Sequence, residues 1–495
     1  LGDVYKRQDY NSFYDIPTDT LNAGERSDYQ VLSLSDKLGG LISFGVDNQK
    51  GQKIKYTFLG LDDVQNSTTY SQKDGGPAGP GIDDQLRTYY EYVEKNIYAH
   101  QLSGNHELKF GAIDNDVFDD VEVSWDIETA TATRLEPGTV EYVYEKTSNT
   151  TDFTLDKKIF FLYSDLEDQV DNARIDIKLP YKFNRRDNYT AFGYFNYQKS
   201  RTLDNRRFKV EHGLGTDVYQ DIDSVFTQTN VDNGDLVLTR NYRPADAYSA
   251  TQDVTAFYVN QLTSITHDLD LLVGARQESS VQQLIDSESG VPYDPLETDD
   301  LLASISLNYS IDNNHKLRFV AANTLSRPDF REFSPNRYKD PVTENIVFGY
   351  PDLQYTTIVN LDMKYEWYIS YDEMFSVGLF QKDFTNPVET IINQDPDSQT
   401  GNKIVSYRNA LGATSNGIEF GLRKKFGFLG RSFSNYYIAT NFAYINSNIR
   451  LDENSDDVMI KELTSKDRPM QGQSPYVFNL NIGCLLYTSP SPRDS

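Results

Sequence analysis

From about residue 38 onward, the sequence repeats segments in which every second side chain is apolar. The clearest example runs from Ala303 to Ser310, where apolar side chains alternate with serine and asparagine. Successive side chains of a β-strand point to opposite faces, so this segment would present one apolar and one polar face. We therefore expect each segment to be a strand that separates an apolar environment from water.

Short polar turns and long hydrophilic excursions connect these segments in strict alternation. The turn Asp312–His315 is followed by a strand and then by an excursion from Leu325 to about Thr357. We expect about fifteen strands of about ten residues each, the length that crosses a bilayer when tilted. The other short turns are predicted at Asn48–Gln52, Asp114–Asp119, Lys182–Asn188, Ser264–His267, Ser370–Glu373 and Gly427–Ser432. The predicted fold is an all-β, antiparallel transmembrane β-barrel with long loops at one end.

The composition agrees with a barrel although it looks soluble at first. The mean hydropathy is -0.59 and the formal net charge is -27. A barrel wall needs apolar side chains only at alternate positions, and its lumen and loops are hydrophilic, so the average stays polar. Aromatic residues make up 13% of the chain. Many lie near predicted strand ends, which suits the interfacial girdles of a membrane barrel, although tyrosine also favours strands of any kind.

The two ends of the chain differ from the rest. Residues 1–8 and 484–495 resemble translated adapter sequence, and we expect both to lie outside the fold. The only cysteine, Cys484, belongs to the second of these segments. A single cysteine provides no disulfide framework and no thiolate metal site.

Five pieces of the second half resemble the strand-and-loop signatures of TonB-dependent outer-membrane receptors, in the same order as in that family. They are Leu317–Glu332, Gly349–Gln354 with its continuation to Trp367, Ser376–Glu389, Asn416–Glu419 and Gln471–Val477. Before residue 300 the resemblance is only architectural. It implies that residues 9–483 are part of a family barrel of 22 strands, with short turns periplasmic and long loops extracellular.

The resemblance also implies a function in the outer membrane of a Gram-negative bacterium. In the family, a plug domain closes the lumen and binds the TonB complex, which drives uptake of a scarce ligand such as a siderophore, cobalamin, oligosaccharide or peptide. We therefore expect outer-membrane lipid, lipopolysaccharide, the TonB complex and such a ligand as partners, and no cofactor. The acidic composition argues against a nucleic-acid partner.

An acidic stretch provides the candidate ligand-binding residues. No lysine or arginine occurs between Arg276 and Lys316, while acidic residues are frequent there. The candidates are Asp286, Glu288, Asp294 and Asp299. They are suited to attract cationic or metal-bearing ligands, or to bridge to lipopolysaccharide through divalent ions. The alternative is a solvated loop surface, because runs of charge are usually exposed.

The remaining motifs do not predict a metal site or catalysis. Asp452–Asp457 begins like a calcium loop but lacks the glycine and the final glutamate, and Asp114–Asp116 suits a tight turn. Gly75–Gly81 lacks the lysine of a phosphate loop, and His106 lacks a second histidine four positions on. No G-x-S-x-G motif is present. We therefore expect that the protein is not an enzyme.

Two other functions share parts of this pattern. A passive, porin-like barrel would show the same alternation without energy coupling. A secreted all-β polysaccharide-binding or polysaccharide-active protein would lack the alternation of long and short connections.

Overall fold

The computed structural model describes residues 2–15, 20–74, 82–109, 120–147, 153–213, 222–243, 246–287, 289–340, 345–394, 403–463 and 465–484. Two of the predicted features, the turn Asp114–Asp119 and the loop Gly75–Gly81, lie outside these residues. None of the described helices is long and apolar enough to span a membrane.

One antiparallel sheet of 19 strands forms the wall. Three of its strands, β6, β9 and β22, are short and pair at the side of longer ones. The other sixteen pair in chain order, each with the next. They are β1 (Gly2–Asp15), β2 (Thr20–Asp47), β3 (Gln52–Asp74), β4 (Ile82–Leu108), β5 (Val121–Thr147), β7 (Lys158–Phe183), β8 (Arg186–His212), β10 (Ala247–Ser264), β11 (Leu269–Asp286), β12 (Leu296–Ser310), β13 (His315–Ser326), β16 (Thr356–Ser370), β17 (Glu373–Thr385), β20 (Gly412–Lys425), β21 (Tyr436–Arg450) and β23 (Tyr476–Cys484).

The remaining elements belong to the connections. The short side strands are β6 (Thr154–Leu155), β9 (Leu236–Arg240) and β22 (Asp467–Arg468). A second sheet has the order β14 (Tyr338–Lys339), β15 (Ile346–Val347), β19 (Lys403–Asn409) and β18 (Val388–Gln394). The helices are α1 (Ile222–Val225), α2 (Gln228–Asp232), α3 (Phe330–Phe333) and α4 (Val458–Lys461), with 3-10 turns η1 (Phe426–Leu429) and η2 (Arg431–Phe433).

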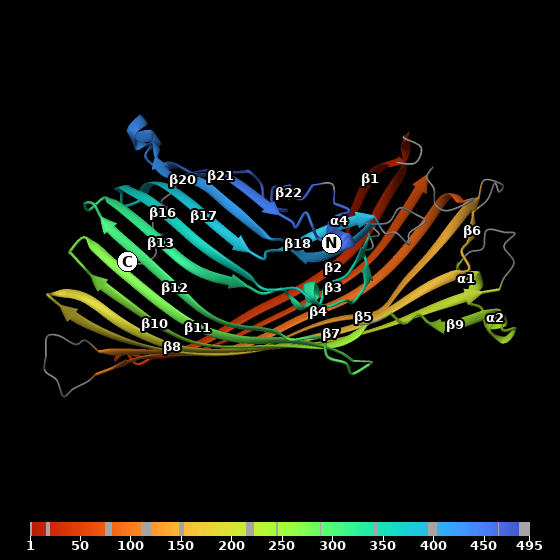
Figure 1. Ribbon diagram of the computed structural model, residues 1–495, viewed down its shortest axis with the longest axis horizontal. Coiled ribbons are helices and arrows are strands. Elements are labelled where there is room, and N and C mark those ends of the chain that lie inside the picture. Colours follow the sequence, from red (N-terminus) through yellow and green to blue (C-terminus); the bar gives the residue numbers. More distant parts are fainter. Residues whose placement is uncertain are drawn as a thin grey trace, which may run out of the picture.

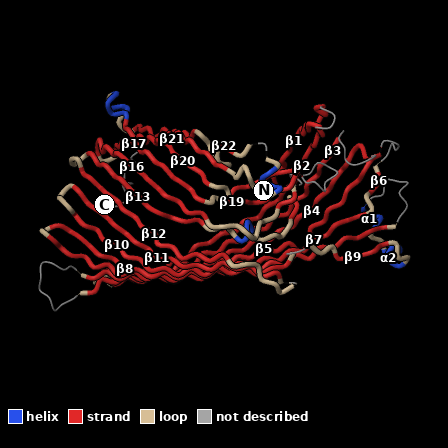
Figure 2. The backbone as a smooth tube through the Cα atoms, viewed as in Figure 1, coloured by secondary structure: helices blue, strands red, loops and turns tan. Residues whose placement is uncertain are grey.

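The wall is strongly curved, with the N-terminal strands β2–β5 on one side and the later strands β13–β21 on the other (Figure 1). Strands make up nearly all of this wall, and the other elements gather at its ends (Figure 2). In the described part of the chain no pairing joins β1 to β23. The wall is therefore an open arc of a barrel, and the predicted fold class is confirmed with sixteen wall strands.

The short turns lie where the sequence predicts them, although some are tighter. Residues 184–185 alone join β7 to β8, and both Asn184 (φ 52°) and Arg185 (φ 62°) adopt the left-handed conformation of a type I′ hairpin. Residues 48–51, 265–268, 311–314 and 371–372 form the other tight turns among the described residues, all at the same end of the wall. The longer turn at 426–435 contains η1 and η2.

The strands of the first half are much longer than predicted. Strand β2 has 28 residues and β4, β5 and β8 have 27 each, whereas β17 has 13. The prediction of about ten residues was wrong here because the hydrophilic excursions continue the hydrogen-bonded ladder beyond the apolar band. About ten tilted residues cross a membrane, so the upper parts of these strands stand above it.

Exposure confirms which face of the wall is apolar. Outward-facing side chains are exposed although they are apolar, as with Ile305 (38%) and Val359 (46%). Inward-facing polar side chains are covered, as with Asn360 (9%) and Glu366 (6%). This arrangement is the reverse of a water-soluble protein and is what a wall between lipid and a polar lumen requires.

We expect a charge on the outer face to destabilise the barrel far more than the same charge on the inner face. Ile305 lies five residues from the end of β12, near the middle of the apolar band, and Ser306 is its inward-facing neighbour. Ile305→Arg should lower the free energy of unfolding in phospholipid vesicles by about 2–4 kcal/mol. Ser306→Arg is the matched control and should cost less than about 1 kcal/mol. Equal losses in a urea titration would show that the outer face does not contact lipid.

Candidate functional site

The connection between β13 and β16, residues 327–355, folds inward over the inner face of the wall. Its helix α3 places two phenylalanines, Phe330 and Phe333, in a cluster with Leu203, Tyr248 and Leu284 of strands β8, β10 and β11. Both phenylalanine side chains are 1% exposed. Burial of two aromatic side chains therefore holds this loop against the wall.

Asp329 fixes the start of α3 and ties it to the wall. Its carboxylate accepts a hydrogen bond from the backbone N–H of Arg331, and the Glu332 carboxylate accepts one from the Asp329 backbone N–H, which completes a capping box. Lys199 Nζ and Arg201 Nη1 of β8 lie 3.4 Å and 3.5 Å from its oxygens. Burial alone would raise the pKa of Asp329, but the Arg331 N–H and the charges of Lys199 and Arg201 lower it below its usual value.

Gly349 lets two parts of this loop approach each other closely. Its N–H donates to Ser334 O at 2.8 Å, and the N–H of Tyr350 donates to Glu332 O at 2.7 Å. A Cβ atom at position 349 would collide with the carbonyl oxygens of Ser334 and Glu332. Only glycine therefore permits this contact.

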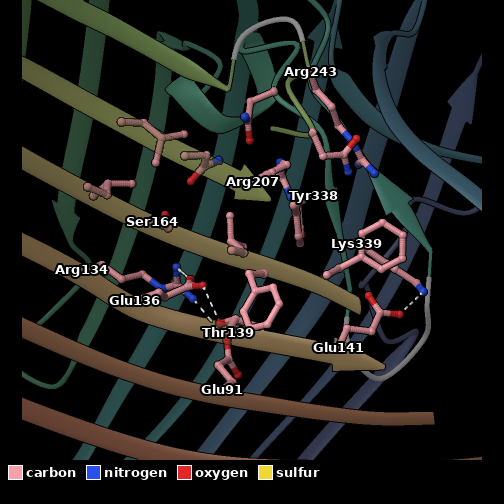
Figure 3. Close-up of a pocket in the computed structure, with 18 of the residues that line it drawn as sticks. Glu91, Arg134, Glu136, Thr139, Glu141, Ser164, Arg207, Arg243, Tyr338 and Lys339 are labelled. Atoms are coloured by element: carbon pink, nitrogen blue, oxygen red, sulfur yellow. Dashed lines mark hydrogen bonds and ion pairs between the residues drawn. The ribbon is translucent and has the colours of Figure 1, made fainter. Parts of the chain in front are cut away.

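A cavity of about 550 Å³ lies between the inward loop and the tall strands β5, β7 and β8. Its apolar lining includes Phe160, Phe161, Leu162, Leu166 and Phe208. Its charged lining consists of Glu91, Arg134, Glu136, Glu141, Arg201, Arg207, Arg243, Asp329, Arg331 and Lys339. In Figure 3, Arg207 and Arg243 lie on one side of the view, and Glu91, Arg134 and Glu136 lie on the opposite side.

All four carboxylates of the lining are engaged by cations. Arg134 contacts both Glu136 and Glu91, the latter at 3.5 Å. The ammonium of Lys339 lies 2.9 Å from Glu141 (Figure 3), and Arg201 and Lys199 flank Asp329 as described above. The acidic side chains of the cavity therefore hold its own basic side chains in place.

Two of the lining arginines pair with carboxylates outside the lining. Arg201 binds Asp168 through Nε and Nη2, both at 2.6 Å, in a bidentate pair. Arg207 Nε donates to Asp246 Oδ1 at 2.8 Å. These pairs fix the two guanidinium groups on the wall.

The sequence from residue 118 to residue 492 matches the family described as TonB dependent receptor-like, beta-barrel. The chain belongs to this family. No curated protein matches the sequence. The TonB-dependent receptors are transporters of the Gram-negative outer membrane and not enzymes.

Several solved structures of outer-membrane transporters are similar. The ferric citrate transporter FecA is 12% identical, with 91% of this chain and 60% of that chain covered at a TM-score of 0.47. The alcaligin receptor FauA from Bordetella pertussis is 11% identical, with 97% and 64% covered at 0.43. The siderophore receptor PiuA from Acinetobacter baumannii is 11% identical, with 96% and 68% covered at 0.47. The chain thus spans 60% and 64% of the lengths of the first two.

The acidic candidates predicted from the sequence lie elsewhere on the receptor barrel. Asp286 accepts hydrogen bonds from the backbone and hydroxyl of Ser289 and so shapes the loop after β11. Asp299 accepts from Gln277 and Ser279 of the neighbouring strand. Asp294 is exposed, and Glu288 lies outside the described residues. None of the three described candidates lines the cavity.

The other acidic positions build structure. Glu278 is buried on the inner face, where Arg276 and Arg327 contact its carboxylate, the latter at 2.8 Å. Asp452 and Asp457 accept hydrogen bonds from backbone N–H groups two residues ahead, as in tight turns. In the described part of the barrel, no three His, Cys, Asp or Glu side chains gather closely enough to hold a metal ion.

The arginines of the cavity were not predicted. Arg134, Arg207, Arg243 and Arg331 are spread over almost two hundred residues and form no sequence motif. The pairing of β5 with β7 and of β7 with β8, together with the inward fold of α3, brings them together. The sequence contains one local signal for this site. In Asp329–Glu332 an aspartate is followed three residues later by a glutamate, and this spacing predicts a capping box at the start of a helix.

We expect Asp329→Ala to loosen the inward loop. The substitution removes the helix cap, worth about 1 kcal/mol, and both ion pairs to β8. Limited proteolysis of the receptor should then cut within residues 327–355 faster than in the wild type. Because the pKa of Asp329 is lowered in the folded state, its contribution is complete above the ordinary value of 3.8 and is lost as the pH falls below it.

Asp294→Ala is the control for this experiment. It removes an exposed loop carboxylate that forms no hydrogen bond or ion pair with the residues that the structure describes. Proteolysis of the Asp294→Ala variant should match the wild type, and equal sensitivity of the two variants would contradict the anchoring role of Asp329.

Proposed function

We propose that this chain is the barrel of a receptor that captures a scarce ligand outside the cell and imports it in a step coupled to the TonB complex. Family membership supports the coupling, which would act through a plug domain in the lumen. The cavity between the inward loop and the tall strands supports capture. It opens on the inner face of the wall, above the apolar band, where a ligand would arrive before passing through the lumen.

The inward loop favours a receptor over a passive pore. Strand β15 of the loop pairs with β19 of the next extracellular connection, while β14 pairs with β15 and β18 pairs with β19, so the two loops form one sheet at the mouth. A second cluster, which includes Ile391, Ile449 and Met459, packs the third loop against them. Loops that are tied together across the mouth restrict free diffusion and form a surface that a ligand can recognise.

A transport experiment tests the coupling. Cells that carry the full-length receptor are compared with a deletion strain, and solutes that only the first strain removes from a defined medium are identified by mass spectrometry. We expect deletion of tonB, or an uncoupler of the proton-motive force, to abolish this removal. Continued, non-saturating removal by uncoupled cells would instead indicate a passive barrel.

A further inference from the structure

Two guanidinium groups of the cavity have no carboxylate partner within the described part of the chain. Arg134, Arg201, Arg207 and Lys339 all form the ion pairs given above, but no ion pair involves Arg243 or Arg331. The Arg331 guanidinium lies 3.6 Å from the centroid of the Tyr338 ring, which covers one of its faces. Both arginines are half-buried, so solvent compensates their charges only partly.

Arg243 lies in a cluster of like charge. Arg207 and Arg337 are close enough to lower its pKa, in addition to the larger effect of burial, while Asp246 and Glu141 oppose this. Asp246 is already bound by Arg207. Arg207 also donates from Nη2 to the backbone oxygen of Arg337 at 2.8 Å, which holds the two segments together. Arg243 and Arg207 therefore line the cavity together, and the carboxylate between them, Asp246, is already bound by Arg207.

The same cavity offers a second polar contact. Asn205 lines it, is 7% exposed, and its Oδ1 atom has no hydrogen-bond partner among the described residues. A buried amide oxygen without a partner costs free energy unless a ligand or water donates to it. The phenylalanines of β7 supply an apolar surface nearby.

We propose that the cavity recognises an anionic ligand through a carboxylate or phosphate group, which binds Arg243 beside Arg207 (Figure 3) and is attracted by Arg331. This proposal rests on the proposed receptor function and names the class of ligand. Planar guanidinium groups match carboxylate and phosphate oxygens in geometry as well as in charge. A volume of about 550 Å³ suits a small molecule.

The ion pairs of the cavity argue against a cationic ligand. Each of its four carboxylates, Glu91, Glu136, Glu141 and Asp329, already contacts a basic side chain. A cation would have to displace one of these basic side chains from its carboxylate. An anion could instead bind Arg243 and Arg331, which have no carboxylate partner among the described residues. The class of ligand thus follows from which charges remain unpaired.

Binding of simple anions to the purified full-length receptor tests the proposal. Isothermal titration calorimetry is performed with tricarballylate as the carboxylate probe and inorganic pyrophosphate as the phosphate probe. We expect at least one to bind, with an affinity that falls as salt is added. Arg243→Gln and Arg331→Gln should each weaken this binding about tenfold or more, and Arg243→Lys should weaken it less.

Arg206→Gln is the matched control. Arg206 is adjacent to Arg207 on β8 but does not line the cavity, and it pairs with Asp204 at 3.5 Å on an exposed surface. It changes the net charge by the same amount and should leave anion binding unchanged. The heat-modifiable migration of each variant on gels verifies that its barrel is folded.

The outcomes separate this proposal from the one on which it rests. If neither anion binds, or if Arg206→Gln and Arg243→Gln weaken binding equally, the proposed anionic class of ligand is overturned. Uptake that still requires TonB would then leave the receptor function standing. Tighter binding of one probe would show whether the cavity prefers a carboxylate or a phosphate group, and either preference supports the proposal.

Discussion

The structure depends on backbone hydrogen bonding in a medium that offers no partners. Within hydrocarbon each unpaired N–H or C=O group costs several kcal/mol, so every strand in the membrane must pair on both sides. The wall strands from β2 to β21 meet this requirement by pairing with their neighbours in chain order, which tight turns such as 184–185 permit. In the described part of the chain β1 and β23 each pair on one side only. Because the backbone groups are hydrogen-bonded in this way, the side chains of one face can be apolar and contact lipid while those of the other face are polar and line the lumen.

This constraint explains why the wall was predictable from the sequence. Alternation fixes the face of each residue, so Ile305 and Val359 could be assigned to the outside without coordinates. The same logic fails above the membrane, where both faces of β5 and β8 meet water or loops and their alternation weakens. The length of these strands was therefore missed, because hydrophilic strands and hydrophilic loops have similar compositions.

The site was not predictable for a related reason. A run of acidic residues is visible in a sequence, and it led to Asp286, which accepts hydrogen bonds from Ser289 of the following loop, and to Asp299, which accepts them from the neighbouring strand β11. The arginines of the cavity come from β5, from β8 and from two different loops, and no local pattern connects them. Which of these arginines lack a carboxylate partner among the described residues is a property of the packed structure and cannot be read from the sequence.

The excess of acidic residues does not conflict with a site for anions. The net charge of -27 is spread over a wall and rim that extend for many tens of ångströms, and at physiological ionic strength charges act over about 8 Å. Inside a partly enclosed cavity the field comes from the nearest groups, and there the carboxylates are already paired. Arg243 and Arg331, which have no carboxylate partner among the described residues, therefore contribute unpaired positive charge to this cavity.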